Sequence, residues 1–203
     1  MADSKQSKRP RARQMKPEER KRLLLDTAVS CFAEKGLSSA KHADIAAACG
    51  VAVPTVFSYF PTREDLTKAV LNEVARLIRD SMKASLDCEG SNEERLFNNA
   101  VQMSALTREH PDYMKVWIMW TTHFAPEIQG QLKLFEKELL DVLCELIQPG
   151  SSQADPDEAT HDKARIIVGA NIFLMKMIFD GIDEKRQISY IKHVISFVLA
   201  DMA

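Results

Sequence analysis

Apolar residues recur every three or four positions along most of the chain, which is the spacing of one face of an α-helix. The first such segment begins at Pro17, has Glu18 and Glu19 in its first turn, and ends at Gly36. Its apolar face carries Leu24, Ala28, Cys31 and Phe32. The pattern predicts one amphipathic helix here.

Two short helices are predicted next, one over about residues 42–49 and one from Pro54 through Tyr59. Gly50 lies between them and can adopt the backbone conformation of a sharp turn. Pro54 suits the first turn of the second short helix. Two short helices that are joined by a glycine turn and supported by a longer helix predict a helix-turn-helix, whose second helix fits the major groove of DNA.

The rest of the chain is also predicted to be helical, because it shows neither strand alternation nor an internal repeat. Thr62 is a suitable N-cap, with Asp65 three residues later, for a long amphipathic helix that continues toward Leu86. Further helices are expected over about 92–109, 111–124, 126–147, 157–180 and 184–202. The expected fold class is all-α, with an N-terminal three-helix helix-turn-helix domain and a larger helical C-terminal domain for dimerisation and ligand binding.

Charge is unevenly distributed along the chain. The 203 residues have a net charge of −2, but residues 1–70 hold 13 Lys and Arg against 8 Asp and Glu, a net +5, which leaves −7 for the rest. The opening segment SKQSKRPRARQMKPEERKR is basic and has few apolar residues, so it is either a solvated tail or an arm that contacts nucleic acid. We expect a basic flexible arm over residues 1–16, a DNA-binding domain over 17–61, and a regulatory and dimerisation domain over 62–203.

Other classes of protein receive little support. No apolar run reaches the roughly 18 residues of a membrane-spanning helix and the N-terminus lacks a secretory signal, so a cytoplasmic location is expected. The four cysteines show no metal-binding spacing and are interpreted as structural, so no metal or other cofactor is predicted. No GxSxG, HExxH or Gly-rich phosphate motif is present, and the pattern does not indicate an enzyme.

The candidate DNA-reading face lies on the second short helix. Its outward positions are expected to be Thr55, Ser58 and Tyr59, whose hydroxyls can contact phosphates or base edges. Taken singly, each could be an ordinary surface or packed residue. Their joint placement after a basic arm favours DNA contact. The residues expected to fix the crossing angle of the two helices from inside are Ile45, Val51, Val56 and Phe57.

The last two predicted helices carry apolar stripes that are wider than one core contact requires. A pair of these helices from each of two subunits could close a four-helix bundle, which predicts a homodimer, although burial within a monomer is the alternative. Two recognition helices about one turn of DNA apart would match a palindromic site. The stripes comprise Ile166, Ile167, Ala170, Phe173, Leu174, Met177 and Ile178, then Ile188, Ile191, Val194, Ile195, Val198 and Leu199.

The segment DIAAACGVAVPTVFSYFPTREDL resembles the DNA-binding domain of TetR-type transcription regulators over roughly residues 17–70. More narrowly, RPRAR, HADIA, the YFPTREDL run and KVWIMW resemble the LuxR/HapR group of quorum-sensing master regulators of vibrios. This resemblance implies a homodimer that binds double-stranded promoter DNA and represses or activates transcription.

The resemblance also implies DNA-contacting positions. The arm residues Arg9, Arg11 and Arg13 would enter a minor groove, and Arg63 would contact a phosphate. Lys41 and His42, at the start of the first short helix, complete the expected set. The chain departs from the group at Ser58, where the group usually has Asn, at Pro54, and at Ala40-Lys41, which replaces a Gly pair. Ser reads bases less specifically than Asn, so the target sequence is expected to differ.

A ligand pocket is implied by the same resemblance, between the long fourth helix and the helices after it. By position, it would be lined by Ile78, Met82, Trp117, Leu132, Glu136, Leu140 and Phe173. Its occupant would be a small apolar effector, or it could have none. Met114, Trp117, Met119, Trp120 and Phe124 also cluster at helical spacing, as adaptable core or as pocket lining.

Three functions remain open at this point. The first is a dimeric transcriptional regulator on a pseudo-palindromic operator in quorum-sensing control. The second is a local TetR-type repressor with an unrelated small-molecule effector. The third is a helical protein-interaction module, which a dispensable basic arm would favour.

Overall fold

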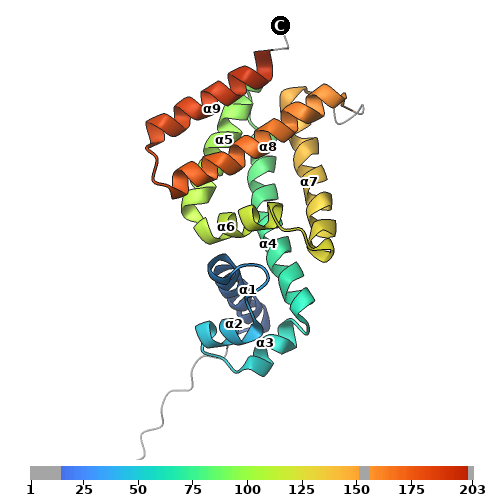
Figure 1. The fold of residues 1–203 in the computed structure, drawn as a ribbon, viewed down its shortest axis with the longest axis vertical. Coiled ribbons are helices and arrows are strands. Elements are labelled where there is room, and N and C mark those ends of the chain that lie inside the picture. The colour runs from blue at the N-terminus through green and yellow to red at the C-terminus, as the bar shows by residue number, and fades with distance from the viewer. Residues whose placement is uncertain (1–14, 151–155, 201–203) are drawn as a thin grey trace, which may run out of the picture.

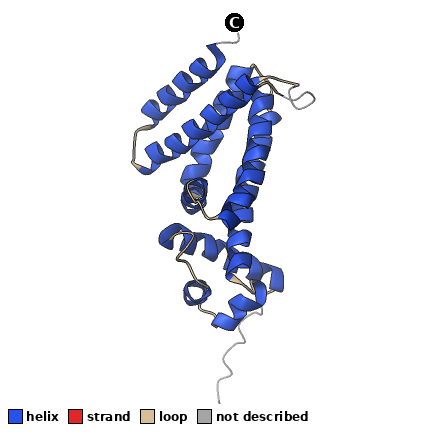
Figure 2. Ribbon diagram, turned by 45° about the vertical axis from the view of Figure 1, so that its right-hand side comes forward, coloured by secondary structure: helices blue, strands red, loops and turns tan. Residues whose placement is uncertain are grey.

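The computed structural model describes residues 15–150 and 156–200, and every regular element in these ranges is helical. Figure 1 shows an elongated molecule with the first helices of the chain at one end, the later helices at the other and α4 running between them; Figure 2 shows the same all-helical arrangement from another side. The all-α prediction is confirmed. The helices are α1 Pro17–Lys35, α2 His42–Cys49, α3 Val53–Tyr59, α4 Arg63–Leu86, α5 Asn92–Glu109, α6 Pro111–Thr121, α7 Pro126–Ile147, α8 Glu158–Phe179 and α9 Glu184–Leu199.

Capping residues set most of these bounds. Pro17, Pro111 and Pro126 each open a helix, where the missing N–H costs nothing and the fixed φ suits the first turn. Thr62 caps α4 reciprocally with Asp65: the Asp65 N–H donates to Thr62 Oγ1 at 3.0 Å, and the Thr62 N–H donates to Asp65 Oδ2 at 3.1 Å. Such local signals explain why the sequence predicts helix starts well.

One helix end differs from the expected one. The helix predicted over 111–124 ends at Thr121, because the hydroxyls of Thr121 and Thr122 both donate to the carbonyl of Ile118 and compete with helical bonding. Ala125 precedes Pro126 and is extended. Phe124 therefore lies in the connecting loop with 88% of its surface exposed, outside the expected aromatic cluster.

A continuous apolar core joins the two ends of the molecule through α4. In the larger part, Trp117, Trp120 and Phe135 form its aromatic centre: the Trp120 and Phe135 rings stack at 5.6 Å, and Trp117 meets both edge-on. All four cysteines are free, and Cys31 and Cys144 are buried, in keeping with a structural role. No helix in the described ranges is both long and apolar enough to cross a membrane.

We expect Trp120→Ala to lower the free energy of unfolding by about 3–5 kcal/mol, because the side chain is fully buried and its loss leaves a cavity. Phe124→Ala is the matched control and should change it by less than about 0.5 kcal/mol. Urea unfolding of both variants measures the two values, and equal losses would contradict the placement of the two aromatics.

Candidate nucleic-acid interface

The turn between α2 and α3 depends on the backbone of Gly50. Its φ of 65° and ψ of 34° lie in the left-handed region, which glycine enters without steric cost. The chain then reverses, and the Val51 N–H donates to the carbonyl of Ala46 at 3.0 Å. This turn sets α3 across α2 in a helix-turn-helix, as the sequence predicts.

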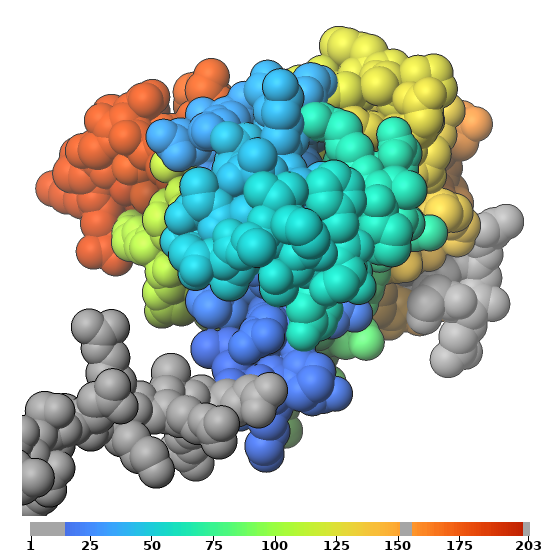
Figure 3. Space-filling view, turned by 90° about the horizontal axis from the view of Figure 1, so that it is seen from below, coloured from blue at the N-terminus to red at the C-terminus, as the bar shows by residue number. Residues whose placement is uncertain are grey.

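Three apolar side chains of this unit belong to the core that also contains residues of α1 and α4. Ile45 and Val56 are completely buried, and Phe60, which ends α3, is 2% exposed. Val56 and Phe60 are four residues apart, so they share the inner side of the short helix. The opposite side of α3 is left at the surface. Figure 3, viewed from this end of the molecule, shows α2, α3 and the start of α4 in light blue to teal at the centre of the face, with α1 in blue beside them.

Phe57 lies on the outer side and not in the core as expected. It is 45% exposed, and its ring stacks on His42 with the centroids 4.1 Å apart. Val56 and Phe60 are four residues apart and share the buried side of α3. Phe57 follows Val56 by one residue, so its side chain points about 100° away from that of Val56 around the helix axis. With Val53, which is 38% exposed, Phe57 adds an apolar component that could meet a thymine methyl group.

The hydroxyl residues predicted for DNA lie around this surface. Ser58 is exposed, and its hydroxyl donates to the carbonyl of Thr55 at 2.7 Å, which leaves its oxygen free to accept. Thr55 and Tyr59 are half-buried. Within the described part of the chain, no protein group bonds to either of their hydroxyls, so both are available to a ligand. Lys41 is exposed at the N-cap of α2.

His42 requires a correction, because it is only 6% exposed. Its Nε2 donates to the carbonyl of Phe60 at 2.7 Å, and its ring stacks on Phe57. The side chain joins the start of α2 to the end of α3 and is not on the surface that DNA would meet. His42 therefore supports the interface from inside.

Arg63, which was expected to contact a phosphate, also has a structural role. Its Nη1 donates to the carbonyl of Ala40 at 2.9 Å and its Nη2 to that of Leu37 at 2.8 Å. These bonds hold the α1–α2 loop against the start of α4. Only the remaining N–H donors of the guanidinium could reach a phosphate. The predicted arm residues Arg9, Arg11 and Arg13 lie outside the described residues.

The expected ligand pocket is only partly assembled. Ile78, Met82 and Trp117 line a cavity of about 20 Å³, which has room for about one water molecule. Leu132 is buried elsewhere in the core, and Leu140 is half-buried. Glu136 is half-buried, and this burial raises the pKa of its carboxyl. Phe173 is 54% exposed and packs on Tyr190 of α9, so it lies on the surface instead of in the pocket.

A helix-turn-helix thus lies at one end of a larger helical body. Residues 24–70 match the family described as bacterial regulatory proteins, tetR family. This segment contains α2, α3 and the outward surface described above. The family match therefore covers the N-terminal part of the chain alone.

Individual proteins are also similar to the chain. The chain is 38% identical over 122 residues to the HTH-type transcriptional regulator LuxR of Vibrio harveyi, a match that covers 60% of this chain and 59% of LuxR. It is 26% identical over 154 residues to the HTH-type transcriptional regulator BetI of Cronobacter sakazakii, covering 74% and 76% of the two chains. A TetR-like regulator from Rhodococcus sp. RHA1 has the same fold, with a TM-score of 0.76 at 16% identity over 93% of this chain and 98% of that one. These relatives are regulators and not enzymes.

We expect His42→Ala to lower the free energy of unfolding by about 1–3 kcal/mol, because the Phe60 carbonyl loses its donor and Phe57 loses its stacking partner. Lys41→Ala removes the exposed neighbouring side chain and should change it by less than about 0.5 kcal/mol. Thermal and urea unfolding distinguish the two. Wild-type stability of His42→Ala would mean that the ring is not part of the interior.

Proposed function

We propose that the protein is a sequence-specific DNA-binding transcriptional regulator that acts as a homodimer on a pseudo-palindromic operator. The observation that carries the proposal is the outer side of α3, where the Thr55 and Tyr59 hydroxyls have no protein partner within the described residues while Val56 is fully buried behind them. A short, rigidly mounted helix with free hydroxyls suits the major groove. The basic segment before α1 supplies charge for phosphates and a minor groove.

Dimerisation is supported by exposed apolar side chains on one flank of the larger part. Figure 1 shows α8 and α9 side by side on this flank. The phenylalanine and isoleucine side chains here have 38% to 69% of their surface exposed. A monomeric protein rarely leaves so many large apolar side chains together at its surface. A partner's α8 and α9 would cover them in a four-helix arrangement. These residues are Ile166, Phe173, Phe179, Ile182 and Phe197.

A role in quorum-sensing control is the finer part of the proposal. It is supported by the 38% identity to Vibrio harveyi LuxR and by the resemblance of the RPRAR and YFPTREDL segments to the LuxR/HapR group. Ser58 stands where that group usually has Asn, and its hydroxyl is already bonded to Thr55. We therefore propose an operator related to, but different from, those of the group.

We expect Thr55→Ala and Tyr59→Phe each to weaken operator binding by about 1–3 kcal/mol, which is the usual cost of a lost base contact. The operator is first obtained by selecting bound duplexes from a random pool with the purified full chain at two salt concentrations. Arg9→Ala with Arg11→Ala should weaken binding most at A·T-rich flanks and reduce the salt dependence by about two counterions. Lys133→Ala with Lys137→Ala, on α7, removes the same charge away from the interface and should leave affinity unchanged. Unchanged affinity in all the interface variants at matched salt would overturn the proposal.

We expect Phe173→Asp with Phe197→Asp to convert the protein to a monomer, because two carboxylates would be buried without partners in the proposed dimer. Leu134→Asp is the matched control, since Leu134 is 71% exposed on α7, away from this flank. Light scattering at the concentration where the wild type is dimeric gives the result. A wild-type monomer, or a variant that remains dimeric, would rule out the α8–α9 interface.

A further inference from the structure

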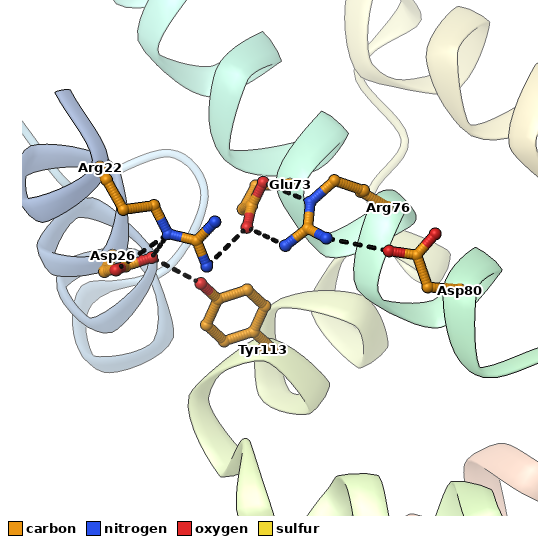
Figure 4. Close-up of polar contacts among 6 residues, drawn as sticks. All are labelled: Arg22, Asp26, Glu73, Arg76, Asp80 and Tyr113. Carbon is orange, nitrogen blue, oxygen red and sulfur yellow. Dashed lines mark hydrogen bonds and ion pairs between the residues drawn. The ribbon is translucent and has the colours of Figure 1, made fainter. Parts of the chain in front are cut away.

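A chain of polar contacts links the helix-turn-helix part to the centre of α4 and to α6. We call it the α1–α4–α6 network; its members are Arg22 and Asp26 of α1, Glu73, Arg76 and Asp80 of α4, and Tyr113 of α6 (Figure 4). The Tyr113 hydroxyl donates to Asp26 Oδ1 at 2.9 Å. Arg22 bonds to Asp26 at 3.0 Å through Nε and reaches Glu73 Oε1 at 3.3 Å through Nη2.

Glu73 is the centre of this network. Its side chain is only 9% exposed, yet it carries a carboxylate, which is costly to bury without partners. Arg76 supplies a bidentate contact, with 2.7 Å and 3.0 Å bonds to the two oxygens, and also bonds to Asp80 at 2.9 Å. Arg22 approaches from α1 and provides the second guanidinium. Moving α1 would therefore deprive a buried carboxylate of one of its two cations.

Tyr113 supplies a second fixed point. It is half-buried, and burial together with the bond to Asp26 raises the pKa of its hydroxyl. The hydroxyl therefore remains a donor at any pH at which the protein would work. Its bond joins α6 to α1 directly, so α1 is held from both α4 and α6.

These bonds are directional, whereas the apolar packing of α1 on α4 and α6 is not. The angle of α1 on the larger part is thus defined by the network. α2 packs on α1 and α3 packs on α2, so the position of α3 follows that of α1, and α3 lies on the far side of this unit (Figure 1). A small rotation at the network would displace α3 along the DNA.

We propose that the α1–α4–α6 network sets the separation of the two recognition helices in the dimer, and thereby the operator half-site spacing that the protein accepts. The inference rests on the proposed function, because it requires a dimer on a two-fold site. Arg22, Asp26, Glu73 and Tyr113 act as positioning residues and need not touch DNA. Spacing is a geometric property of a dimeric helix-turn-helix protein, and a looser mounting of each unit would accept more spacings.

The test uses the full chain and duplexes that carry the selected half-sites with the spacer at its optimum or one base pair shorter or longer. The wild type should prefer the optimum. Tyr113→Phe and Arg22→Met should lower that preference by about fivefold or more, while binding to a duplex with a single half-site stays within about twofold of the wild type. Tyr113→Phe removes one oxygen atom, so folding should be retained, and urea unfolding verifies this.

Two control variants remove the same kinds of group, a tyrosine hydroxyl and a cation, from contacts that lie wholly within the larger part of the molecule. Tyr190→Phe removes a hydroxyl that bonds to the Ala170 carbonyl at 3.1 Å between α9 and α8. Lys137→Met removes a cation paired with Asp141 at 3.1 Å within α7. Both should keep the wild-type spacer preference, even if their stability falls.

The outcomes separate the two proposals. If the wild type reads an operator and both network variants keep its spacer preference, the network does not set spacing and only this inference fails. If the network variants lose affinity equally for single and double half-sites, their role is a general structural one and the inference also fails. If the wild type selects no duplex at all, the proposed function fails, and the inference fails with it.

Discussion

The structure depends on one constraint: α4 belongs to the cores of both parts of the molecule. Leu66 and Val70 near its start are buried, and α4 packs on α1, whereas Ile78 and Met82 are buried beside Trp117 in the larger part. A straight helix transmits a displacement along its whole length, because its backbone bonds resist bending. The helix-turn-helix and the interior of the larger part are therefore coupled through α4, and the polar contacts of α4 with α1 add to this coupling.

Helix positions could be read from the sequence because local chemistry decides them. Prolines at first turns, the Thr62–Asp65 cap and Gly50 act within a few residues of themselves, so their effect does not require knowledge of the fold. The exception was the end of α6, where two adjacent threonines bond back to Ile118. That competition is local as well, but it depends on rotamers that a pattern of apolar residues does not report.

The candidate site was less predictable because side-chain roles depend on distant partners. His42 and Arg63 are polar residues at helix starts, which favours a surface interpretation, yet their partners are backbone carbonyls up to 26 residues away. The apolar pattern assigns Phe57 to the interior, and transfer by position assigns Phe173 to a pocket, but both side chains are exposed. The bond between Asp26 and Tyr113 spans 87 residues and leaves no periodic signal in the sequence. Transfer by position from the resembling group gave seven lining residues for a pocket, and of these Ile78, Met82 and Trp117 share one small cavity.

The brevity of α3 has a consequence for how this protein could be divided. Seven residues are too few to form a stable helix in water, so α3 exists only because Val56 and Phe60 are buried and because His42 bonds to its end. The helix-turn-helix also depends on α4, because Arg63 at its start donates to the carbonyls of Leu37 and Ala40 in the loop between α1 and α2. A fragment cut at the end of the helix-turn-helix would lose this support and unfold. The smallest piece that could be excised, fused to another protein or grafted into a hybrid regulator must therefore include the first turns of α4.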